Sequence, residues 1–363
     1  MSNTGNWNME RILKGARKLK ASDIHLLQGL APVFRVNGEI RLSEGEPLSP
    51  EALQTLLDEM INERQREIFA QEWRLSISRQ WPGLGRFRTS VYLHAGCPEM
   101  AIRLCETVVR PSEELGLTTV IDELTRLPNG LVLITGPTGM GKTTTMNYMI
   151  DMINRQRRCK IVTIEDPVEF VHENHRSIVV QQEVTTDTVS FRSALTHVLR
   201  QDPDVIAVGE MRDLETIETA LTAAETGHLV LATLHTPDAV QTAQRIYSVF
   251  PGDQQNNIVM QLANSLQAII CQRLLPRADN LKGRVLAMEV CIATPAVRKH
   301  LRDRQMHLIQ SEIQTGRKYH MQTMDQSLLE LYQRAEISYD VCMSNARDPE
   351  FIRSRTGGGK DEA

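Results

Sequence analysis

The chain has 363 residues, of which 41% are hydrophobic, 24% charged and 4% aromatic, and its formal net charge is −4. This composition is typical of a soluble globular protein of two or three domains, and it excludes collagen-like and wholly disordered chains. The acidic balance disfavours a broad nucleic-acid-binding face, and the scarcity of aromatic residues disfavours a stacking platform for single strands. We therefore expect no direct nucleic-acid partner.

Two further features of the sequence bear on where the protein works. No apolar run approaches the roughly 20 residues that span a bilayer, and the first 20 residues lack the continuous apolar core of a secretory signal. None of the six cysteines forms a CxxC pair, which disfavours a zinc ribbon or a redox pair. We therefore expect a cytoplasmic protein with reduced thiols.

The start of the chain predicts a helix followed by a β-hairpin. Apolar side chains recur there at helical spacing: Met9, Ile12, Leu13, Ala16 and Leu19. Residues 33–36 and 39–42 then flank Asn37–Gly38. Asn-Gly favours the type I′ turn, whose twist matches that of the two strands it joins, so these residues indicate a hairpin.

The elements that follow complete a small α+β domain, which we expect to end at residue 110. Ser49 and Pro50 are typical of the cap and the first position of a helix, and this helix is expected to reach about Asn62. Two more strands are predicted at 84–93 and 99–104.

Residues 111–363 alternate between strand and helix patterns. Apolar strands are predicted at four places: 130–135, 160–165, 204–208 and 228–234. Helical patterns lie between them, and the chain beyond Thr294 is expected to be mostly helical. This alternation implies a largely parallel sheet with helices on both faces. We therefore expect a second, α/β domain over residues 111–363.

A phosphate-binding loop follows the first of these strands. The motif GxxxxGK[ST] is matched at every position by Gly136, Pro137, Thr138, Gly139, Met140, Gly141, Lys142 and Thr143. Glycines let backbone N–H groups approach phosphate oxygens, and the N-terminus of the following helix favours anions. Lys142 is expected to reach the β and γ phosphates and Thr143 to ligate Mg²⁺. Thr144 is assigned to the same site, and a purely structural Gly-rich turn is the disfavoured alternative.

Hydrolysis requires acidic residues beside this loop, and the sequence offers two acidic strand ends. Glu210 follows the strand at 204–208, and parallel sheets bind ligands at the carboxyl ends of their strands. Glu210 is therefore expected to reach Mg²⁺ or its water, although Gly209 separates it from the apolar run and a surface role is the alternative. Glu165, Asp166 and Glu169 follow another strand, where they would serve metal or water, or form a solvated loop.

Two histidines bracket the strand at 228–234. Their separation of seven residues puts His228 and His235 at opposite ends and on opposite faces of this strand, so the two cannot bind one metal there. His235, at the carboxyl end, would be placed to sense the γ-phosphate. A structural role is the alternative for either histidine.

These motifs resemble those of the secretion-superfamily ATPases, and most closely the type IV pilus retraction ATPases of the PilT family. The matching stretches are GPTGMGKTTT at 136–145, TIEDPVEF at 163–170 and the block at 200–236. The resemblance implies a PAS-like N-terminal domain, a RecA-like ATPase domain and a homohexameric ring. It also implies ATP and Mg²⁺ as cofactors, pilus retraction and twitching motility as the function, and partners in an inner-membrane platform protein and other pilus ATPases.

The family also assigns roles to residues. It implies an acidic box at Glu165, Asp166 and Glu169, with Asp166 near the nucleotide and Glu169 as the leading candidate for polarising the attacking water. Glu210 would hold Mg²⁺ through water, although the division of work between the two glutamates stays open. N-terminal arginines come toward the nucleotide in this family, and three positions match: Arg86, Arg88 and Arg103.

Three stretches depart from the family pattern. Residues 296–303 keep the alanine and both arginines of an AIRNLIRE-like segment but end in Asp303. An arginine often present after the RFRVN strand is replaced within His94–Gly96, and the VN of that strand is Thr89–Ser90. These departures keep open an accessory retraction ATPase, a type II or IV secretion ATPase, or a weakly hydrolysing regulatory paralogue.

Overall fold

The computed structural model describes residues 7–36, 38–105, 108–278 and 283–356. The chain forms two compact units. The N-terminal unit holds residues 1–108 together with two later segments, 165–172 and 182–189. The C-terminal unit holds residues 109–164, 173–181 and 190–363.

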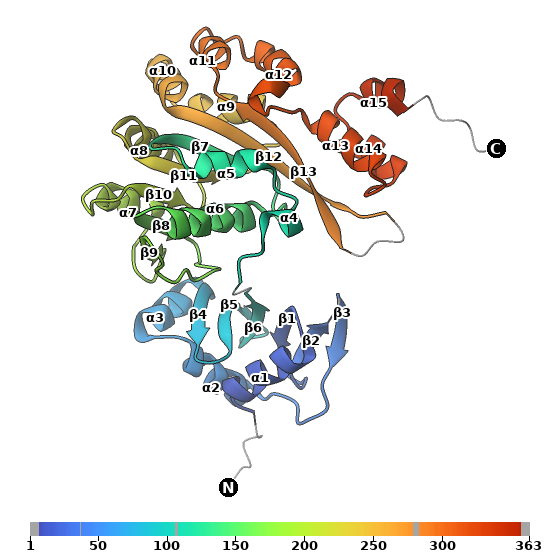
Figure 1. Cartoon of the computed structure of the whole chain (residues 1–363). Helices are drawn as coiled ribbons and strands as arrows, with labels where there is room; N and C mark the ends of the chain where they lie inside the picture. The colour runs from blue at the N-terminus through green and yellow to red at the C-terminus, as the bar shows by residue number, and fades with distance from the viewer. Residues whose placement is uncertain (1–6, 37, 106–107, 279–282, 357–363) are drawn as a thin grey trace, which may run out of the picture. The chain divides into compact units, whose positions relative to one another are not determined.

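The N-terminal unit is built on a six-stranded antiparallel sheet in the order β3-β2-β1-β6-β5-β4 (Figure 1). Its strands are β1 (Asp23–Leu26), β2 (Val33–Val36), β3 (Glu39–Leu42), β4 (Arg74–Trp81), β5 (Gly85–His94) and β6 (Cys97–Leu104). Its helices are α1 (Met9–Leu19), α2 (Pro50–Met60) and α3 (Glu63–Glu72). One apolar core joins α1 and α2 to the sheet.

Local signals in this unit are largely confirmed. The hairpin forms as expected, with Val36 paired to Glu39. The Ser49 side chain accepts the N–H of Ala52 and caps α2 as predicted, although the helix ends at Met60. The predicted helix at the start of the chain is α1, in which Met9, Ile12, Leu13 and Ala16 are buried, whereas Leu19 in the last turn has an exposed fraction of 44%.

The C-terminal unit contains a seven-stranded sheet in the order β13-β12-β7-β11-β10-β8-β9 (Figure 1). Its strands are β7 (Gly130–Thr135), β8 (Lys160–Glu165), β9 (Ile178–Glu183), β10 (Val205–Val208), β11 (Leu229–Leu234), β12 (Leu266–Pro276) and β13 (Arg284–Ile292). The five strands from β12 to β8 pair in parallel, and β13 pairs antiparallel to β12. The predicted α/β class with a largely parallel sheet is confirmed.

Helices surround this sheet and continue to residue 356, the last one that the structure describes. They are α4 (Ser112–Leu115), α5 (Thr119–Thr125), α6 (Lys142–Gln156), α7 (Phe191–Val198), α8 (Leu214–Glu225), α9 (Ala239–Ser248), α10 (Gln255–Ser265), α11 (Pro295–Arg302), α12 (Met306–Thr315), α13 (Met324–Gln333), α14 (Tyr339–Asn345) and α15 (Pro349–Thr356), with a 3₁₀ turn at Arg317–Tyr319. The mostly helical end expected beyond Thr294 is confirmed.

The sheet positions the site because its central strands are buried on both faces. Every residue of β7, β10 and β11 is buried, as expected for strands covered by helices on both sides. α5 and α6 pack against the face that carries Val132 and Ile134 (Figure 1). Because β7, β11 and β10 are parallel neighbours, the loops that follow them emerge at the same edge of the sheet.

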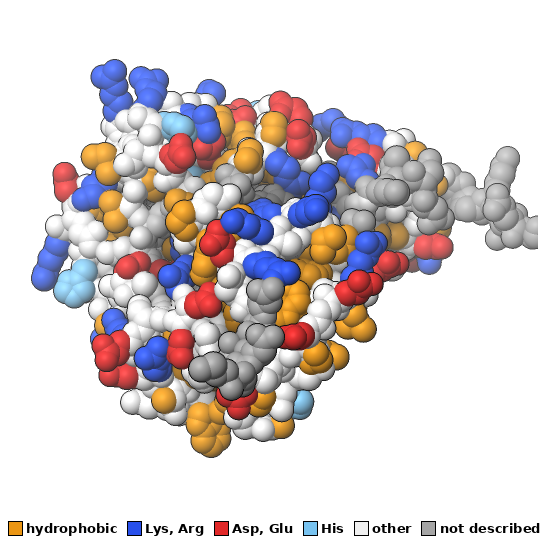
Figure 2. All heavy atoms as spheres, turned by 90° about the horizontal axis from the view of Figure 1, so that it is seen from below, with side chains coloured by type: hydrophobic (Ala, Val, Ile, Leu, Met, Phe, Trp, Pro, Cys, Tyr) orange, Lys and Arg blue, Asp and Glu red, His pale blue; other side chains and the backbone are white. Residues whose placement is uncertain are grey.

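Two properties of the described residues concern the exterior. None of the helices within these residues is both long enough and apolar enough to span a membrane. Acidic and basic side chains lie intermingled on the face of the molecule shown in Figure 2.

Candidate nucleotide-binding site

The loop between β7 and α6 has the backbone of a phosphate cradle. Gly136, Gly139 and Gly141 have φ angles of 135°, 79° and 85°, which side chains with a Cβ rarely adopt. A Cβ at Gly136 would also lie 2.4 Å from the carbonyl oxygen of Gln272 on β12. The predicted loop is therefore held tightly against the neighbouring strand at its first residue, and it leads directly into the N-terminus of α6.

Lys142 is turned inward at the base of this loop. Its Nζ donates to the carbonyl oxygens of Gly136 at 2.6 Å and Pro137 at 3.0 Å, and only 8% of the residue is exposed. Burial lowers the pKa of Lys142, and the negative charge of Glu210 partly offsets that effect. The loop thus holds a single ammonium among its own carbonyl groups, which fits an anion such as phosphate.

Glu210 and His235 meet beside this lysine. Glu210 accepts hydrogen bonds from His235 Nε2 at 2.8 Å and from Arg212 Nη2 at 2.7 Å. Burial acts to raise the pKa of Glu210, but the hydrogen bond from Arg212 and the nearby His235 outweigh it, so this pKa is lowered. Glu210 is therefore held as a carboxylate that can accept hydrogen bonds from a water or from a hydrated metal ion.

One imidazole ring connects the loop to Glu210. His235 Nδ1 lies 3.4 Å from Lys142 Nζ and 3.4 Å from Thr138 Oγ1, on the side of the ring opposite Glu210. The structure thus brings together Lys142, Glu210 and His235, which follow three neighbouring strands. His228 lies at the other end of β11, where its Nδ1 is 2.9 Å from the carbonyl oxygen of Ala223.

The remaining loop residues differ in exposure. Pro137, Thr138, Gly139 and Thr144 are exposed, whereas Thr143 is half-buried. Met140 is also half-buried, and its sulfur lies 3.2 Å from the backbone nitrogen of Leu274. The exposed positions are the ones that a nucleotide could contact without any change in the buried part of the loop.

One supporting contact near the loop carried no sequence signal. Gln272 Nε2 donates to the hydroxyl of Thr145 at 2.7 Å in the buried interior. It joins the first turn of α6 to β12 across 127 residues of chain. Neither residue is part of the loop motif, so only the fold reveals the pair.

Oxygen donors for Mg²⁺ are present near the loop, in the hydroxyl of Thr143 and the carboxylate of Glu210. Within the described ranges there is no cluster of three or more His, Cys, Asp or Glu side chains that could hold a metal ion. Mg²⁺ commonly keeps several waters and binds through substrate phosphates together with one or two protein oxygens. These residues fit such an ion when a nucleotide supplies the remaining ligands.

The second acidic strand end belongs to the N-terminal unit. Glu169 accepts a hydrogen bond from Arg88 Nη1 at 2.7 Å, and both side chains are partly exposed. Glu165 is buried and Asp166 is exposed. The three carboxylates therefore differ in exposure, and Glu169 is paired with Arg88 of β5.

The other two N-terminal arginines bind carboxylates of their own. Arg86 pairs with Glu183 at 2.9 Å, and Arg103 pairs with Asp23 at 2.9 Å. Burial acts to raise the pKa of Asp23, but the hydrogen bonds from Arg103 and Ser22 and the charges of Arg103 and His25 together outweigh it, so this pKa is lowered. Of these two arginines, Arg103 is the more exposed.

Two of the stretches that depart from the family pattern lie in the turn between β5 and β6 and in the segment 296–303. Ala95 and Gly96 form the turn between β5 and β6, with φ angles of 51° and 78°. Arg298, in the segment 296–303, donates to the carbonyl oxygens of Ala263, Asn264 and Ala293, and so satisfies carbonyl groups at the end of α10. Arg302 of the same segment is exposed.

The chain is similar in sequence to one protein family and to individual proteins of bacteria. Residues 8–358 match the family described as type II/IV secretion system protein. The chain is 41% identical to the type IV pilus retraction ATPase PilT of Pseudomonas aeruginosa, over 94% of this chain and 99% of that protein. It is 37% identical to the type IV pilus ATPase PilU of the same organism, over 95% and 90% of the two chains.

Solved structures agree with this likeness. A crystal structure of the pilus retraction motor PilT with bound ADP matches with a TM-score of 0.89 and 41% identity, and it covers 96% of this chain and 100% of that one. The ATPase DotB of Legionella pneumophila matches with a TM-score of 0.82 and 26% identity, over 93% and 94% of the two chains.

Proposed function

Because this chain belongs to the type II/IV secretion system protein family, as an ATPase of its PilT and PilU branch, we propose that it is a motor that retracts type IV pili. The single observation that carries the proposal is the network of Lys142, His235 and Glu210 beside the phosphate loop. This network joins the phosphate-binding lysine to an ionised carboxylate. Binding and cleavage of a phosphoanhydride need both groups.

In this proposal the loop from Gly136 to Thr144 holds ATP. Backbone N–H groups and the Lys142 ammonium bind the phosphates, and Thr143 together with a water on Glu210 holds Mg²⁺. The bound Mg-ATP supplies the phosphoanhydride bond whose cleavage releases phosphate. His235, at the carboxyl end of β11, orients Glu210 and senses the γ-phosphate of the bound nucleotide.

Glu169 activates the attacking water in this mechanism. A partly exposed carboxylate can orient a water and accept its proton. Asp166 lies on the same segment and assists with nucleotide binding. Arg88 and Arg103 stabilise negative charge that develops on the phosphates, a contribution that is worth ~10³–10⁵ in rate for arginines in other phosphoryl-transfer enzymes.

The assembly follows the family pattern. We propose a homohexamer whose domains, residues 1–110 and 111–363, move against each other as ATP is bound and cleaved. The ring works in the cytoplasm, at the inner membrane, on a platform protein at the base of the pilus and together with other pilus ATPases. The sequence GEMRD at Gly209–Asp213 is intact, which favours an active retraction motor over an accessory one.

An ATPase assay of Lys142→Ala tests the enzymatic part of the proposal. We expect turnover to fall by about 10²–10³-fold, because the phosphates lose their ammonium partner, while the circular dichroism spectrum stays unchanged. In cells, deletion of the gene should give abundant pili without twitching. Phosphate release by Lys142→Ala at the wild-type rate would refute the site assignment.

A second candidate is an accessory or weakly hydrolysing paralogue. The turn at Ala95–Gly96 favours it, because this turn lacks the arginine that often follows the RFRVN strand in the family. Steady-state ATPase activity of the assembled protein distinguishes the two candidates. Rapid turnover supports the motor, and a flat signal supports the paralogue.

A further inference from the structure

We propose that Glu183 is a positioning residue for ATP hydrolysis, which acts with Arg86 to hold the backbone N–H and carbonyl groups of Val168 and so sets the position of Glu169. The inference rests on the proposed function in one respect, namely that Glu169 activates water. It adds a residue that carries no motif signal and that lies 14 positions beyond Glu169 in the chain.

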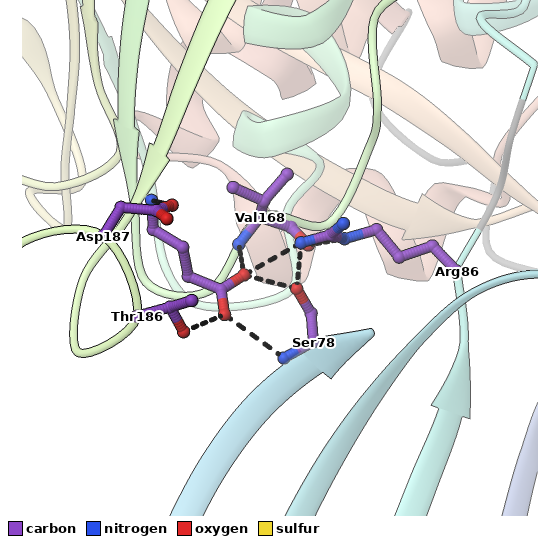
Figure 3. Close-up of polar contacts among 6 residues, drawn as sticks. Ser78, Arg86, Val168, Thr186 and Asp187 are labelled. Carbon is purple, nitrogen blue, oxygen red and sulfur yellow. Dashed lines mark hydrogen bonds and ion pairs between the residues drawn. The ribbon is translucent and has the colours of Figure 1, made fainter. Parts of the chain in front are cut away.

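Glu183 is the centre of a buried polar cluster in the N-terminal unit. Figure 3 labels the residues around it, namely Ser78, Arg86, Val168, Thr186 and Asp187. Only 4% of the Glu183 side chain is exposed. Its carboxylate accepts hydrogen bonds from Arg86 Nη2 at 2.9 Å, from the N–H of Val168 at 3.0 Å and from Thr186 Oγ1 at 3.0 Å. The hydroxyl of Ser78 also donates to it, and the N–H of Ser78 lies 3.5 Å away. This carboxylate is therefore surrounded by hydrogen-bond donors from several segments of the chain.

The cluster holds the Val168 residue by both of its backbone polar groups. The Val168 N–H donates to Glu183, and the Val168 carbonyl oxygen accepts from Arg86 Nε at 2.6 Å. Arg86 and Glu183 are also paired with each other. One buried ion pair thus holds both ends of a single residue, and the next residue in the chain is Glu169.

The same strand presents the partner of Glu169. Arg86 and Arg88 are two positions apart on β5, so their side chains leave the same face of the sheet. Arg86 holds the Val168 backbone and Arg88 holds the Glu169 carboxylate at 2.7 Å. Two arginines of β5 therefore hold the acidic segment, one through the Val168 backbone and the other through the Glu169 side chain.

Glu183 is itself held by a local turn at the end of β9. Its N–H donates to Asp187 Oδ2 at 2.8 Å, and its carbonyl oxygen accepts the N–H of Asp187 at 2.8 Å. Burial of an ion pair often adds no net stability over apolar side chains of the same volume. Because the Arg86–Glu183 pair holds the residue that precedes Glu169, we infer that the pair serves to position Glu169. Small displacements of a catalytic group lower the reaction rate strongly.

The variant Glu183→Gln tests the clamp with a side chain of the same size. We expect kcat for ATP hydrolysis to fall by about 10- to 100-fold, because Glu169 is no longer held in place, while KM for ATP stays within about twofold. Glu336→Gln is the control, because it removes the charge of an ion pair with Arg277 that is partly buried and lies in the other unit. This control should keep the wild-type kcat. A wild-type kcat in Glu183→Gln, or an equal loss in the control, would overturn the proposal.

A double-mutant cycle then asks whether Glu183 acts through Glu169. In a Glu169→Ala background the change Glu183→Gln should cause no further loss of kcat, because a positioned group that is absent cannot be displaced. Full additivity of the two losses would overturn the proposal. A wild-type kcat in Glu169→Ala would do so as well, and would also refute the role proposed for Glu169.

Hydrogen exchange separates the clamp from the chemistry. The amide of Val168 should exchange about tenfold faster in Glu183→Gln than in the wild type, and at the wild-type rate in Glu336→Gln. Unchanged protection of the Val168 amide in Glu183→Gln would overturn the clamp, whatever the rate of ATP hydrolysis in that variant. Absence of ATP hydrolysis in the wild type would instead refute the proposed function.

If Glu183→Gln does not fold, Arg86→Lys repeats each measurement. Lysine keeps the positive charge but lacks the planar guanidinium fork, through which Arg86 donates from Nε to the Val168 carbonyl and from Nη2 to Glu183. The same fall in kcat, with KM unchanged, is expected for this variant. A wild-type kcat would overturn the proposal.

Discussion

Nε2 of His235 lies 2.8 Å from a carboxylate oxygen of Glu210, while Nδ1 of the same ring lies 3.4 Å from the ammonium of Lys142. A carboxylate can only accept and an ammonium can only donate. In the neutral ring these partners therefore select the tautomer with its proton on Nε2 and a lone pair on Nδ1. Through this tautomer His235 connects the lysine of the phosphate loop to the acid that follows β10.

This relationship predicts unequal effects for the two histidines of β11. His235→Ala should lower kcat at least about tenfold, because Glu210 loses a donor and Lys142 loses a neighbour. His228→Ala is the control and should keep the wild-type kcat, since His228 contacts Ala223 at the opposite end of the strand. Steady-state ATPase kinetics of both variants measure the difference. Equal losses in the two variants would contradict the assignment.

The lowered pKa of Glu210 predicts a pH dependence of stability. Because the pKa of Glu210 is lower in the folded chain than its ordinary value of 4.5, ionised Glu210 favours the folded state. This contribution is complete above the ordinary value and is lost as the pH falls through the folded value. Urea unfolding of the wild type and Glu210→Gln should therefore differ by a constant amount at neutral pH, and the difference should shrink below about pH 4.5. A difference that does not change with pH would count against the ion pair.

Two glycines of the phosphate loop should respond differently to alanine. Gly136→Ala places a Cβ against the Gln272 carbonyl at an unfavourable φ, so we expect a loss of about 2–4 kcal/mol in the free energy of unfolding. At Gly139 no heavy atom of the described residues, apart from the glycine and its two chain neighbours, lies within 4 Å of the added Cβ, so backbone strain alone should cost about 1–2 kcal/mol. Chemical denaturation of both variants tests the order. A larger loss at Gly139 would show that the contact with β12 is unimportant.

The segment 296–303 combines a structural arginine with an exposed one. Arg298→Ala should lower the free energy of unfolding by about 2–3 kcal/mol, because three backbone carbonyl oxygens lose a charged donor. Arg302→Ala should leave unfolding unchanged. Thermal unfolding checks both variants. Arg302→Ala is then the variant for motility measurements, since any loss of twitching would not arise from unfolding.

Local patterns were sufficient to predict much of the fold. The Asn-Gly turn predicted the hairpin of β2 and β3, and the glycine-rich motif predicted the loop between β7 and α6. Parallel neighbouring strands also predicted that Glu210 and His235 would emerge at the edge that carries this loop. These predictions depend on the preferences of neighbouring residues and on one general property of parallel sheets. Both can be applied to the sequence without knowledge of the tertiary structure.

Other elements were not predicted. β4 alternates buried Leu75 and Ile77 with polar residues, but this alternation is too short to predict a strand with assurance, because the strand has only two buried apolar positions. β12 begins at Leu266 directly after α10 ends at Ser265, so no turn residues mark the change from helix to strand. Both elements are determined by pairing with partners far along the chain.

The supporting side chains of the site were also not predicted. Glu183 lies 105 residues from Ser78 and 97 from Arg86, and Gln272 lies 127 from Thr145. No local spacing relates such residues, and each pair forms only when the sheets have assembled. The roles of single polar residues in the interior therefore require the tertiary structure.

The close fit of Gly136 against β12 has a mechanical consequence. The first residue of the nucleotide loop cannot shift toward β12 unless that strand shifts with it, because a backbone oxygen blocks the way. β12 is paired along its length with β13, and Met288 of β13 is bonded through its N–H to Ser327 of α13. A continuous series of contacts thus connects the loop through β12 and β13 to α13, so a movement of the loop toward β12 would have to involve these elements as well.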